Sequence, residues 1–239
     1  MKKYQINLVV GTVLLLLLVG CGGASSGGSG SSTTTTTADT EGVMTFKMEA
    51  WADNWFAAYL GDTLIVEDSV SITTERSFNA ESVTFDADYP LHLNFILKDF
   101  KENDTGLEYI GARNQQMGDG GFIMQLTDTG SGDVVAVSNA DWACMVIHEA
   151  PLDKSCEDES NPVAGTAPCD FTDLGEPDGW QTVNFDDSGW TATTVHSASA
   201  VGPKDGYDDI SWDGSADIIW GPDLETNNTV LCRVTVTGS

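Results

Sequence analysis

The stretch WADNWFAAYLGDTLIVEDS, residues 51–69, holds the densest group of aromatic residues in the chain and its first predicted hairpin. Two apolar runs, 54–60 and 63–67, flank a Gly-Asp pair of the kind that forms tight turns. The aromatic rings could form a platform for a ligand or the first corner of a β-sandwich core. Because Trp55 and Phe56 point to opposite sides of a strand, we expect at least one of them in the core, and we interpret the group mainly as scaffold.

The same alternation of apolar and polar residues recurs along the chain. Leu91, Leu93, Phe95 and Leu97 share one face of a predicted strand, as expected for a strand with one side in the core. Other predicted strands lie at 44–50, 82–86, 121–126, 134–137, 141–147 and 229–237. No segment has a helical stripe. Many short strands separated by Gly, Asp and Asn turns predict an all-β sandwich.

Four cysteines follow Cys21, and an even number is typical of disulfides in an oxidising compartment. Cys144 and Cys232 each lie on the apolar face of a predicted strand, so we expect a bridge between two core strands. Cys156 and Cys169 would then staple the long irregular stretch 149–179 into a shorter loop. No CxxC or Cys/His spacing typical of zinc sites is present.

The N-terminus has the pattern of an export signal. Two early lysines precede an apolar run from 8 to 19 that is too short to span a bilayer comfortably. Leu18-Val19-Gly20-Cys21 resembles the lipobox of bacterial lipoproteins, and this resemblance implies removal of residues 1–20 and lipidation of Cys21. The alternative is an ordinary signal peptide with a chance cysteine. Gly22 follows the cysteine where an Asp resembles a retention signal for the inner membrane, so we expect the outer membrane.

Residues 21–42 are rich in Gly, Ser and Thr and predict a flexible tether before one domain at 43–239. The whole chain has a net charge of −27. Loss of Lys2 and Lys3 with the signal leaves 8 basic residues against 37 acidic ones, a net charge of −29. Such a domain would be repelled by nucleic acid and by anionic lipid surfaces. Two interpretations of the charge remain: a generally acidic, soluble surface, which we favour, or carboxylates clustered for Ca²⁺.

Three segments resemble the galactose-binding-like jelly-roll domains, which are β-sandwich modules attached to many glycoside hydrolases and adhesins. They are ADNWFAAYLGDTLI at 52–65, GWQTVNFDDSGWTAT at 179–193 and IIWGPDLETNNTVLCRVTV at 218–236. In the familiar modules the FDDSxW segment and the Arg-bearing strand precede the hairpin, whereas here they follow it. The resemblance therefore implies a jelly roll with a circularly permuted order, which is permissible where chain ends lie close together.

Within FDDSGW we expect structural roles. Asp186 and Asp187 can accept hydrogen bonds from backbone N–H groups in a tight turn. Phe185 and Trp190 would then pack at opposite ends of that turn.

Two acidic loops have the composition of a binding site. The loop KDGYDDISWDGSAD, 204–217, combines aromatic rings that can stack on a sugar with carboxylates that can accept its hydroxyl hydrogens. We therefore predict a ligand site at Tyr207, Asp208, Asp209, Trp212 and Asp213. The loop KDFKENDTGLEY, 98–109, offers oxygen ligands for Ca²⁺ at Asp99, Glu102, Asn103 and Asp104, although it lacks the EF-hand spacing. For each loop the alternative is a solvated acidic surface.

Histidines offer a second kind of metal site. His92, His148 and His196 are far apart in sequence, and Met145 lies three residues before His148. An exported copper site of His and Met ligands is therefore an alternative. Isolated histidines are more often ordinary surface or core residues.

Catalytic motifs are absent: the chain has no GxSxG, HExxH or neighbouring Cys/His pair. Paired carboxylates for glycoside hydrolysis exist in any chain this acidic, but nothing selects one pair. We therefore expect a non-catalytic binding module for carbohydrate or a cell-surface partner, with or without Ca²⁺. The alternatives are the exported metal-binding protein described above and a structural or assembly protein of the cell envelope.

Overall fold

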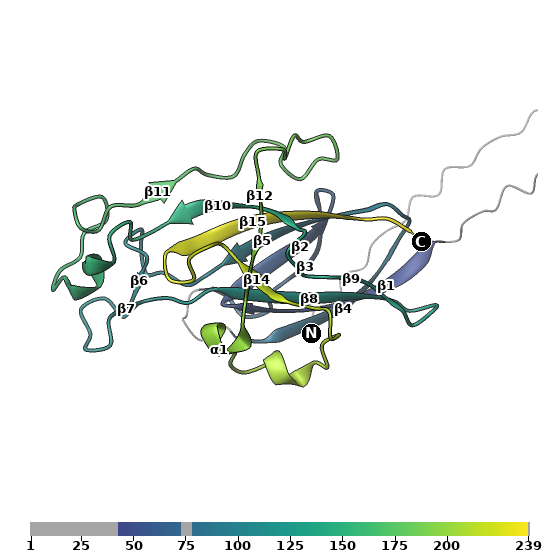
Figure 1. Cartoon of the computed structure of the whole chain (residues 1–239), viewed down its shortest axis with the longest axis horizontal. Coiled ribbons are helices and arrows are strands. Elements are labelled where there is room, and N and C mark those ends of the chain that lie inside the picture. The colour runs from purple at the N-terminus through teal and green to yellow at the C-terminus, as the bar shows by residue number, and fades with distance from the viewer. Residues whose placement is uncertain (1–42, 73–77, 239) are drawn as a thin grey trace, which may run out of the picture. The chain divides into compact units, whose positions relative to one another are not determined.

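Two antiparallel β-sheets face each other across a buried core in the computed structural model, which describes residues 43–72 and 78–238 (Figure 1). These residues belong to one compact unit, 41–239. The expected all-β sandwich is confirmed. The predicted signal peptide, Cys21 and the tether at 21–42 lie outside the described residues. Within the described part, no helix has the length and apolar character needed to cross a membrane.

The first sheet has the strand order β13-β14-β8-β1-β4, with β9 paired to β8. Its strands are β1 (Met44–Asp53), β4 (Ala80–Ala87), β8 (Gly121–Asp128), β9 (Val134–Val137), β13 (Thr194–His196) and β14 (Ile218–Trp220). The central pair β1 and β8 runs antiparallel with Asp53 opposite Gly121 and Phe46 opposite Asp128. Strand β1 therefore runs along the full length of β8, from Met44 at one end of the sandwich to Asp53 at the other.

The second sheet has the order β11-β10-β15-β5-β2-β3, with β12 paired to β10. Its strands are β2 (Trp55–Leu60), β3 (Thr63–Glu67), β5 (Leu91–Lys98), β10 (Ala143–Glu149), β11 (Thr172–Asp173), β12 (Thr191–Ala192) and β15 (Asn227–Val236). A small separate pair is formed by β6 (Leu107–Glu108) and β7 (Gln116–Met117). The helical segments are short: α1 (Ala198–Val201) and the 3₁₀ turns η1 (Lys154–Asp158) and η2 (Tyr207–Asp209).

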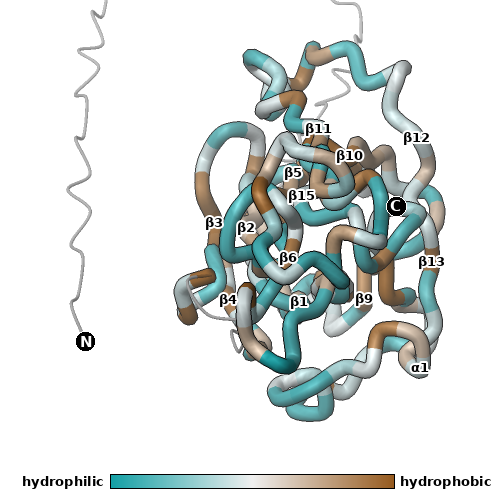
Figure 2. The backbone as a smooth tube through the Cα atoms, turned by 90° about the vertical axis from the view of Figure 1, so that its left-hand side faces the viewer, coloured by the Kyte–Doolittle hydropathy of each residue, from teal (hydrophilic) through white to brown (hydrophobic). Residues whose placement is uncertain are grey.

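The core between the sheets consists of the predicted apolar faces. Leu91, Leu93, Phe95 and Leu97 are fully buried, and the Phe95 ring stacks on Trp142 with their centroids 4.8 Å apart. In the tube of Figure 2, hydrophobic colours concentrate on the strands and hydrophilic colours on the connecting loops. Every strand predicted from alternation is present, with ends that shift by a few residues. The two-residue and three-residue strands have no such pattern and were not predicted.

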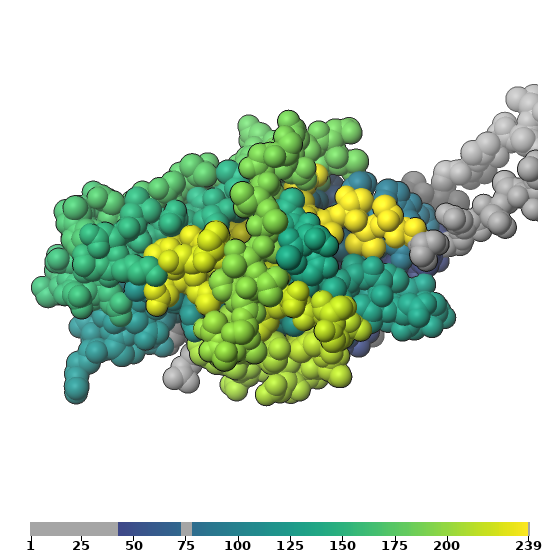
Figure 3. All heavy atoms as spheres, in the orientation of Figure 1, coloured from purple at the N-terminus to yellow at the C-terminus, as the bar shows by residue number. Residues whose placement is uncertain are grey.

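The outer faces of both sheets are also covered. Trp51 and Ile123 of the first sheet pack beneath the segment around Val201 to Trp212, whereas Ile96 and Leu231 of the second sheet pack beneath Trp180 and its neighbours. Figure 3 shows the chain between β12 and α1, in light green, running across the visible face. Since β12 pairs in one sheet and β13 in the other, this segment joins the sheets along one edge.

The aromatic residues of the first hairpin divide between these layers. Phe56 lies fully buried in the core, and Trp51 lies fully buried on the outer face of its sheet. Trp55 is half-buried on the outer face of the second sheet, where Lys98 Nζ lies 5.2 Å from the centre of its ring. The interpretation of the hairpin as scaffold thus holds for Trp51 and Phe56.

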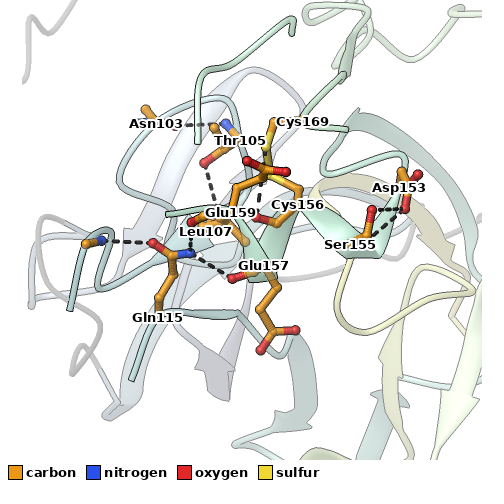
Figure 4. Close-up of a disulfide and its surroundings, with 11 residues drawn as sticks. Asn103, Thr105, Leu107, Gln115, Asp153, Ser155, Cys156, Glu157, Glu159 and Cys169 are labelled. Carbon is orange, nitrogen blue, oxygen red and sulfur yellow. Dashed lines mark hydrogen bonds between the residues drawn. A yellow bond between two sulfur atoms is a disulfide. The ribbon is translucent and has the colours of Figure 1, made fainter. Parts of the chain in front are cut away.

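Both expected disulfides are present. Cys144 and Cys232 face each other on β10 and β15, and Cys156 and Cys169 close a loop of the long 149–179 connection. Figure 4 shows the second bridge, where Gln115 Nε2 donates hydrogen bonds to the backbone oxygens of Glu157 and Glu159. The disulfide therefore closes a loop within the connection, and the hydrogen bonds of Gln115 fasten that loop to the β6–β7 region.

The FDDSGW turn differs from its prediction in two details. Asp186 accepts a hydrogen bond from the Ser188 N–H as expected, but the Asp187 carboxylate accepts one from Arg233 instead. Phe185 and Trp190 do not lie at opposite ends of the turn, because their rings contact each other edge to face at 5.8 Å. Both rings pack on the outer face of the second sheet, and that apolar surface brings them together.

Candidate functional site

Asp53 and Asp99 are two buried carboxylates at the end of the sandwich where β1 and β5 finish. Asp53 is the last residue of β1, and Asp99 directly follows β5. The neighbouring Asn54 N–H donates a hydrogen bond to Lys98 O, which brings the two strand ends together. The two residues are 0 % and 2 % exposed, and within the described residues none of the four carboxylate oxygens has a hydrogen-bond partner. Buried polar groups are normally bonded, so this pair needs an explanation.

The protonation of this pair is strongly perturbed. Burial raises the pKa of Asp53 to about 8, the charge of Asp119 raises it further and Lys204 opposes the rise. Burial also raises the pKa of Asp99 well above its usual range, with the charge of Asp53 as the next cause. The Phe100 N–H, which lowers the pKa of Asp99, donates its hydrogen bond to Asn54 Oδ1. The ionised form of each carboxylate is therefore unfavourable unless a cation lies beside it, and otherwise the carboxyl group binds a proton.

Three further charged groups surround the pair. Lys204 Nζ lies 3.6 Å from Asp53 Oδ2 and 3.5 Å from Asp119 Oδ1. Burial lowers the pKa of Lys204, but the charges of Asp53 and Asp119 outweigh this and the pKa is raised, so the ammonium is charged. Glu108 is buried and accepts a hydrogen bond from Gln116 Nε2. The Lys204 ammonium thus interacts with the charges of Asp53, Asp119 and Glu108.

A groove of about 620 Å³ lies beside this cluster. It is lined by side chains and backbone from the β6–β7 end, η1, α1 and the turn after β14: Gln116, Met117, Gly118, Asp119, Glu157, His196, Ala200, Lys204, Pro222, Asp223, Leu224 and Glu225. Asp119 and Lys204 belong both to the groove and to the buried cluster. Carboxylate and amide oxygens dominate the polar lining, and they suit hydroxyl groups or cations rather than anions.

The predicted Ca²⁺ residues do not converge. Asp99 is buried, whereas Glu102 accepts a hydrogen bond from the Ile110 N–H and Asn103 accepts one from the Thr105 N–H. Asp104 is paired with Lys101 and lies 3.3 Å from His148 Nε2. Across 43–72 and 78–238, no three His, Cys, Asp or Glu side chains stand together in an arrangement that could hold a metal ion. Of the four predicted residues, Asp99 is the one whose carboxylate oxygens are buried without a hydrogen-bond partner among the described residues.

The predicted sugar-binding loop packs on the outer face of the first sheet. Tyr207 meets Trp51 edge to face at 5.5 Å and lies 5.9 Å from Trp212, whose indole N–H donates to Tyr207 O. Both rings are half-buried and are used partly for packing. The Asp213 carboxylate accepts hydrogen bonds from Ser215.

The two remaining residues of that site, Asp208 and Asp209, are exposed. This loop therefore offers two free carboxylates beside rings that are only partly accessible.

The three histidines lie in three different hollows. His92 faces Thr235, His196 Nε2 contacts Gly221 O, and His148 Nδ1 contacts Asn228 Oδ1. Burial lowers the pKa of His148, and the charge of Lys101 lowers it further. The described residues therefore provide no place where these histidines meet, and the shared copper site considered from sequence is not formed by them.

Sequence reasoning missed Asp53, Glu108, Asp119 and Lys204. One signal was available, because Asp53 interrupts the most aromatic and apolar stretch of the chain. The partners come from four separate segments, and only the fold brings them together. Comparisons of this chain with protein-family models, with curated proteins and with solved structures found no match.

Proposed function

We propose that this protein is an exported, lipid-anchored binding module without catalytic activity. Residues 1–20 would be its signal peptide, Cys21 its lipidated residue and 21–42 its tether. The sandwich would be of the galactose-binding-like kind, with the motif order permuted. Its ligand would be a carbohydrate or a carbohydrate-bearing surface partner, and its place the outer membrane of the cell envelope.

The observation that carries this proposal is the position and chemistry of the 620 Å³ groove. Loops cover both outer faces of the sandwich, so its ends and edges are left to meet other molecules. Strand β1 begins at Met44, where the chain leaves the tether, and ends at Asp53 beside the groove cluster. Ten residues of strand span roughly 30 Å, so the groove faces away from the entry point. The two disulfides agree with an oxidising compartment.

A first experiment tests the anchor. The full chain is expressed in a Gram-negative bacterium, fractionated and analysed by intact mass spectrometry. We expect the protein in the membrane fraction, without residues 1–20 and with diacylglycerol on Cys21, and we expect Cys21→Ala to release it. An unmodified Cys21 with the protein free in the periplasm contradicts the lipid anchor.

A second experiment tests the ligand. The full chain is applied to a glycan array, followed by titration of any bound glycan. Glu157→Gln combined with Glu225→Gln removes two groove carboxylates and should weaken binding at least tenfold, since each replaces an acceptor for sugar hydroxyls. The matched control is Asp62→Asn, an exposed acidic residue in the β2–β3 turn. No binding by the folded chain, or equal loss with the control, overturns the groove as a carbohydrate site.

A further inference from the structure

Asp53 and Asp99 form the least satisfied polar group in the described core. Asp53 ends β1 of the first sheet and Asp99 directly follows β5 of the second. Both residues are buried, and their four carboxylate oxygens have no hydrogen-bond partner among the described residues. Removing a carboxylate from water without a partner is strongly unfavourable, so such groups bind either a proton or a cation. The two buried carboxylates therefore indicate a site for a proton or a cation at this end of the sandwich.

Lys204 does not complete the site. Its ammonium is 3.6 Å from Asp53, beyond hydrogen-bond distance, and it is shared with Asp119. The Lys204 side chain is 45 % exposed, so it approaches the pair from the solvent side. No ion pair links it to Asp99. One ammonium at the rim leaves the inner carboxylate without a countercharge.

The Gly118 backbone packs closely against the Asp99 carboxylate. A side chain at Gly118 would place its Cβ 2.1 Å from Asp99 Oδ2, so any larger residue there would displace the Asp99 carboxylate. Gly118 is followed by Asp119, whose charge acts on both buried carboxylates and whose side chain lines the groove. Carboxylate and backbone oxygens are ligands for hard divalent cations, and Ca²⁺ accepts irregular sets of six to eight oxygens better than Mg²⁺ does.

We propose that Asp53 and Asp99 bind one Ca²⁺ ion between the ends of β1 and β5, with Asp119 as a third ligand at the floor of the groove. Because the described residues hold no group of three acidic side chains already arranged for a metal ion, Asp119 would move toward the ion as Lys204 moves away. The ion would join the two sheets at the groove end. This inference does not depend on the carbohydrate proposal.

The experiment uses the full chain, purified in detergent, stripped with EDTA and then titrated with Ca²⁺ by calorimetry and by thermal unfolding. We expect one ion per chain and a rise in melting temperature of at least about 5 °C at saturating Ca²⁺, because a ligand of the native state stabilises it. Asp53→Asn and Asp99→Asn should lose the Ca²⁺ response. Their melting temperatures without Ca²⁺ should equal or exceed that of the wild type, since each removes an uncompensated buried charge.

The matched control is Asp208→Asn with Asp209→Asn, an exposed acidic pair on η2, which should retain the full response. No heat and no thermal shift with Ca²⁺ in the wild type would mean that protons alone neutralise the pair, and the proposal would be wrong. An equal response in Asp53→Asn and in the wild type would assign the effect to the acidic surface and would overturn it as well. If the protein binds no glycan on the array but shows the expected Ca²⁺ response, only the carbohydrate proposal is contradicted.

Discussion

Arg233 Nη1 donates a hydrogen bond to Asp187 Oδ2 at 2.9 Å, and this contact joins β15 to the turn that covers the outer face of its sheet. The same guanidinium donates to Asn94 Oδ1, Phe185 O and Thr182 O. Arg233 is 8 % exposed, so the FDDSGW turn is held by one buried cation with several acceptors. The role of this arginine is therefore to fix a covering segment in place.

Replacing Arg233 should cost far more stability than replacing Asp187. Arg233→Ala removes a buried cation that donates to four acceptors, of which the Asn94 side chain is buried, and we expect a loss of about 2–4 kcal/mol in the free energy of unfolding. Asp187→Ala removes one partner that is 41 % exposed and should cost less than about 1 kcal/mol. Urea unfolding of both variants measures the difference. Equal losses would mean that the ion pair, and not the set of backbone acceptors, holds the turn.

The two disulfides should contribute unequally. Cys144 and Cys232 are separated by 88 residues and Cys156 and Cys169 by 13. Because a cross-link restricts the unfolded chain more when it closes a longer loop, Cys144→Ala with Cys232→Ala should cost about 4–5 kcal/mol, and Cys156→Ala with Cys169→Ala about 3 kcal/mol. Chemical denaturation of the two double variants provides the comparison. A larger loss from the shorter loop would show that contacts around η1, and not loop closure, dominate.

Asp68 should make stability depend on pH. Burial raises its pKa from 3.8 to about 7, and the charge of Glu81 adds to the rise, against hydrogen bonds from Val70 and Asn79. A carboxyl with a raised folded pKa favours the native state below its unfolded pKa, and this contribution is lost as pH rises from about 4 to about 7. Asp68→Asn removes this titration, so its free energy of unfolding should fall less steeply over that range.

The measurement is urea unfolding at several pH values in the presence of EDTA, with Asp62→Asn as an exposed control. Asp53 and Asp99 also have raised pKa values, so the slope should decrease in Asp68→Asn without disappearing. The same slope in Asp68→Asn as in the control would contradict the assignment.

Gly206 should be required for docking of the 202–217 loop. Its φ is +88°, and a Cβ there would lie 2.6 Å from the backbone nitrogen of Ala80 on β4. Gly206→Ala should therefore cost about 1–3 kcal/mol from backbone strain and steric conflict. Gly214→Ala in the same loop has no atom within 4 Å of its new Cβ and should change stability by less than about 0.5 kcal/mol. Thermal unfolding distinguishes the two, and a tolerated Gly206→Ala would mean that the loop moves freely from β4.

The sequence by itself determined the long strands and the inner faces, and it favoured, among three possible pairings, the disulfide pairs that the structure shows. Leu91 to Leu97 and Val230 to Val236 alternate with a period of two, and a half-buried strand has this period whatever its neighbours are. Cysteines on two such faces can be paired by the same reasoning. These features depend on local periodicity, so they can be predicted without knowing how the chain folds back.

Only the tertiary structure decided the order of strands, the covered outer faces and the candidate site. The pairing of β1 with both β4 and β8, and of β12 and β13 with different sheets, has no local sequence signal. Asp53, Asp99 and Lys204 lie far apart along the chain, and their exposure depends on segments that pack over them. Because burial and the distances between charges set the electrostatics of a carboxylate, the unusual chemistry of this pair exists only in the folded chain.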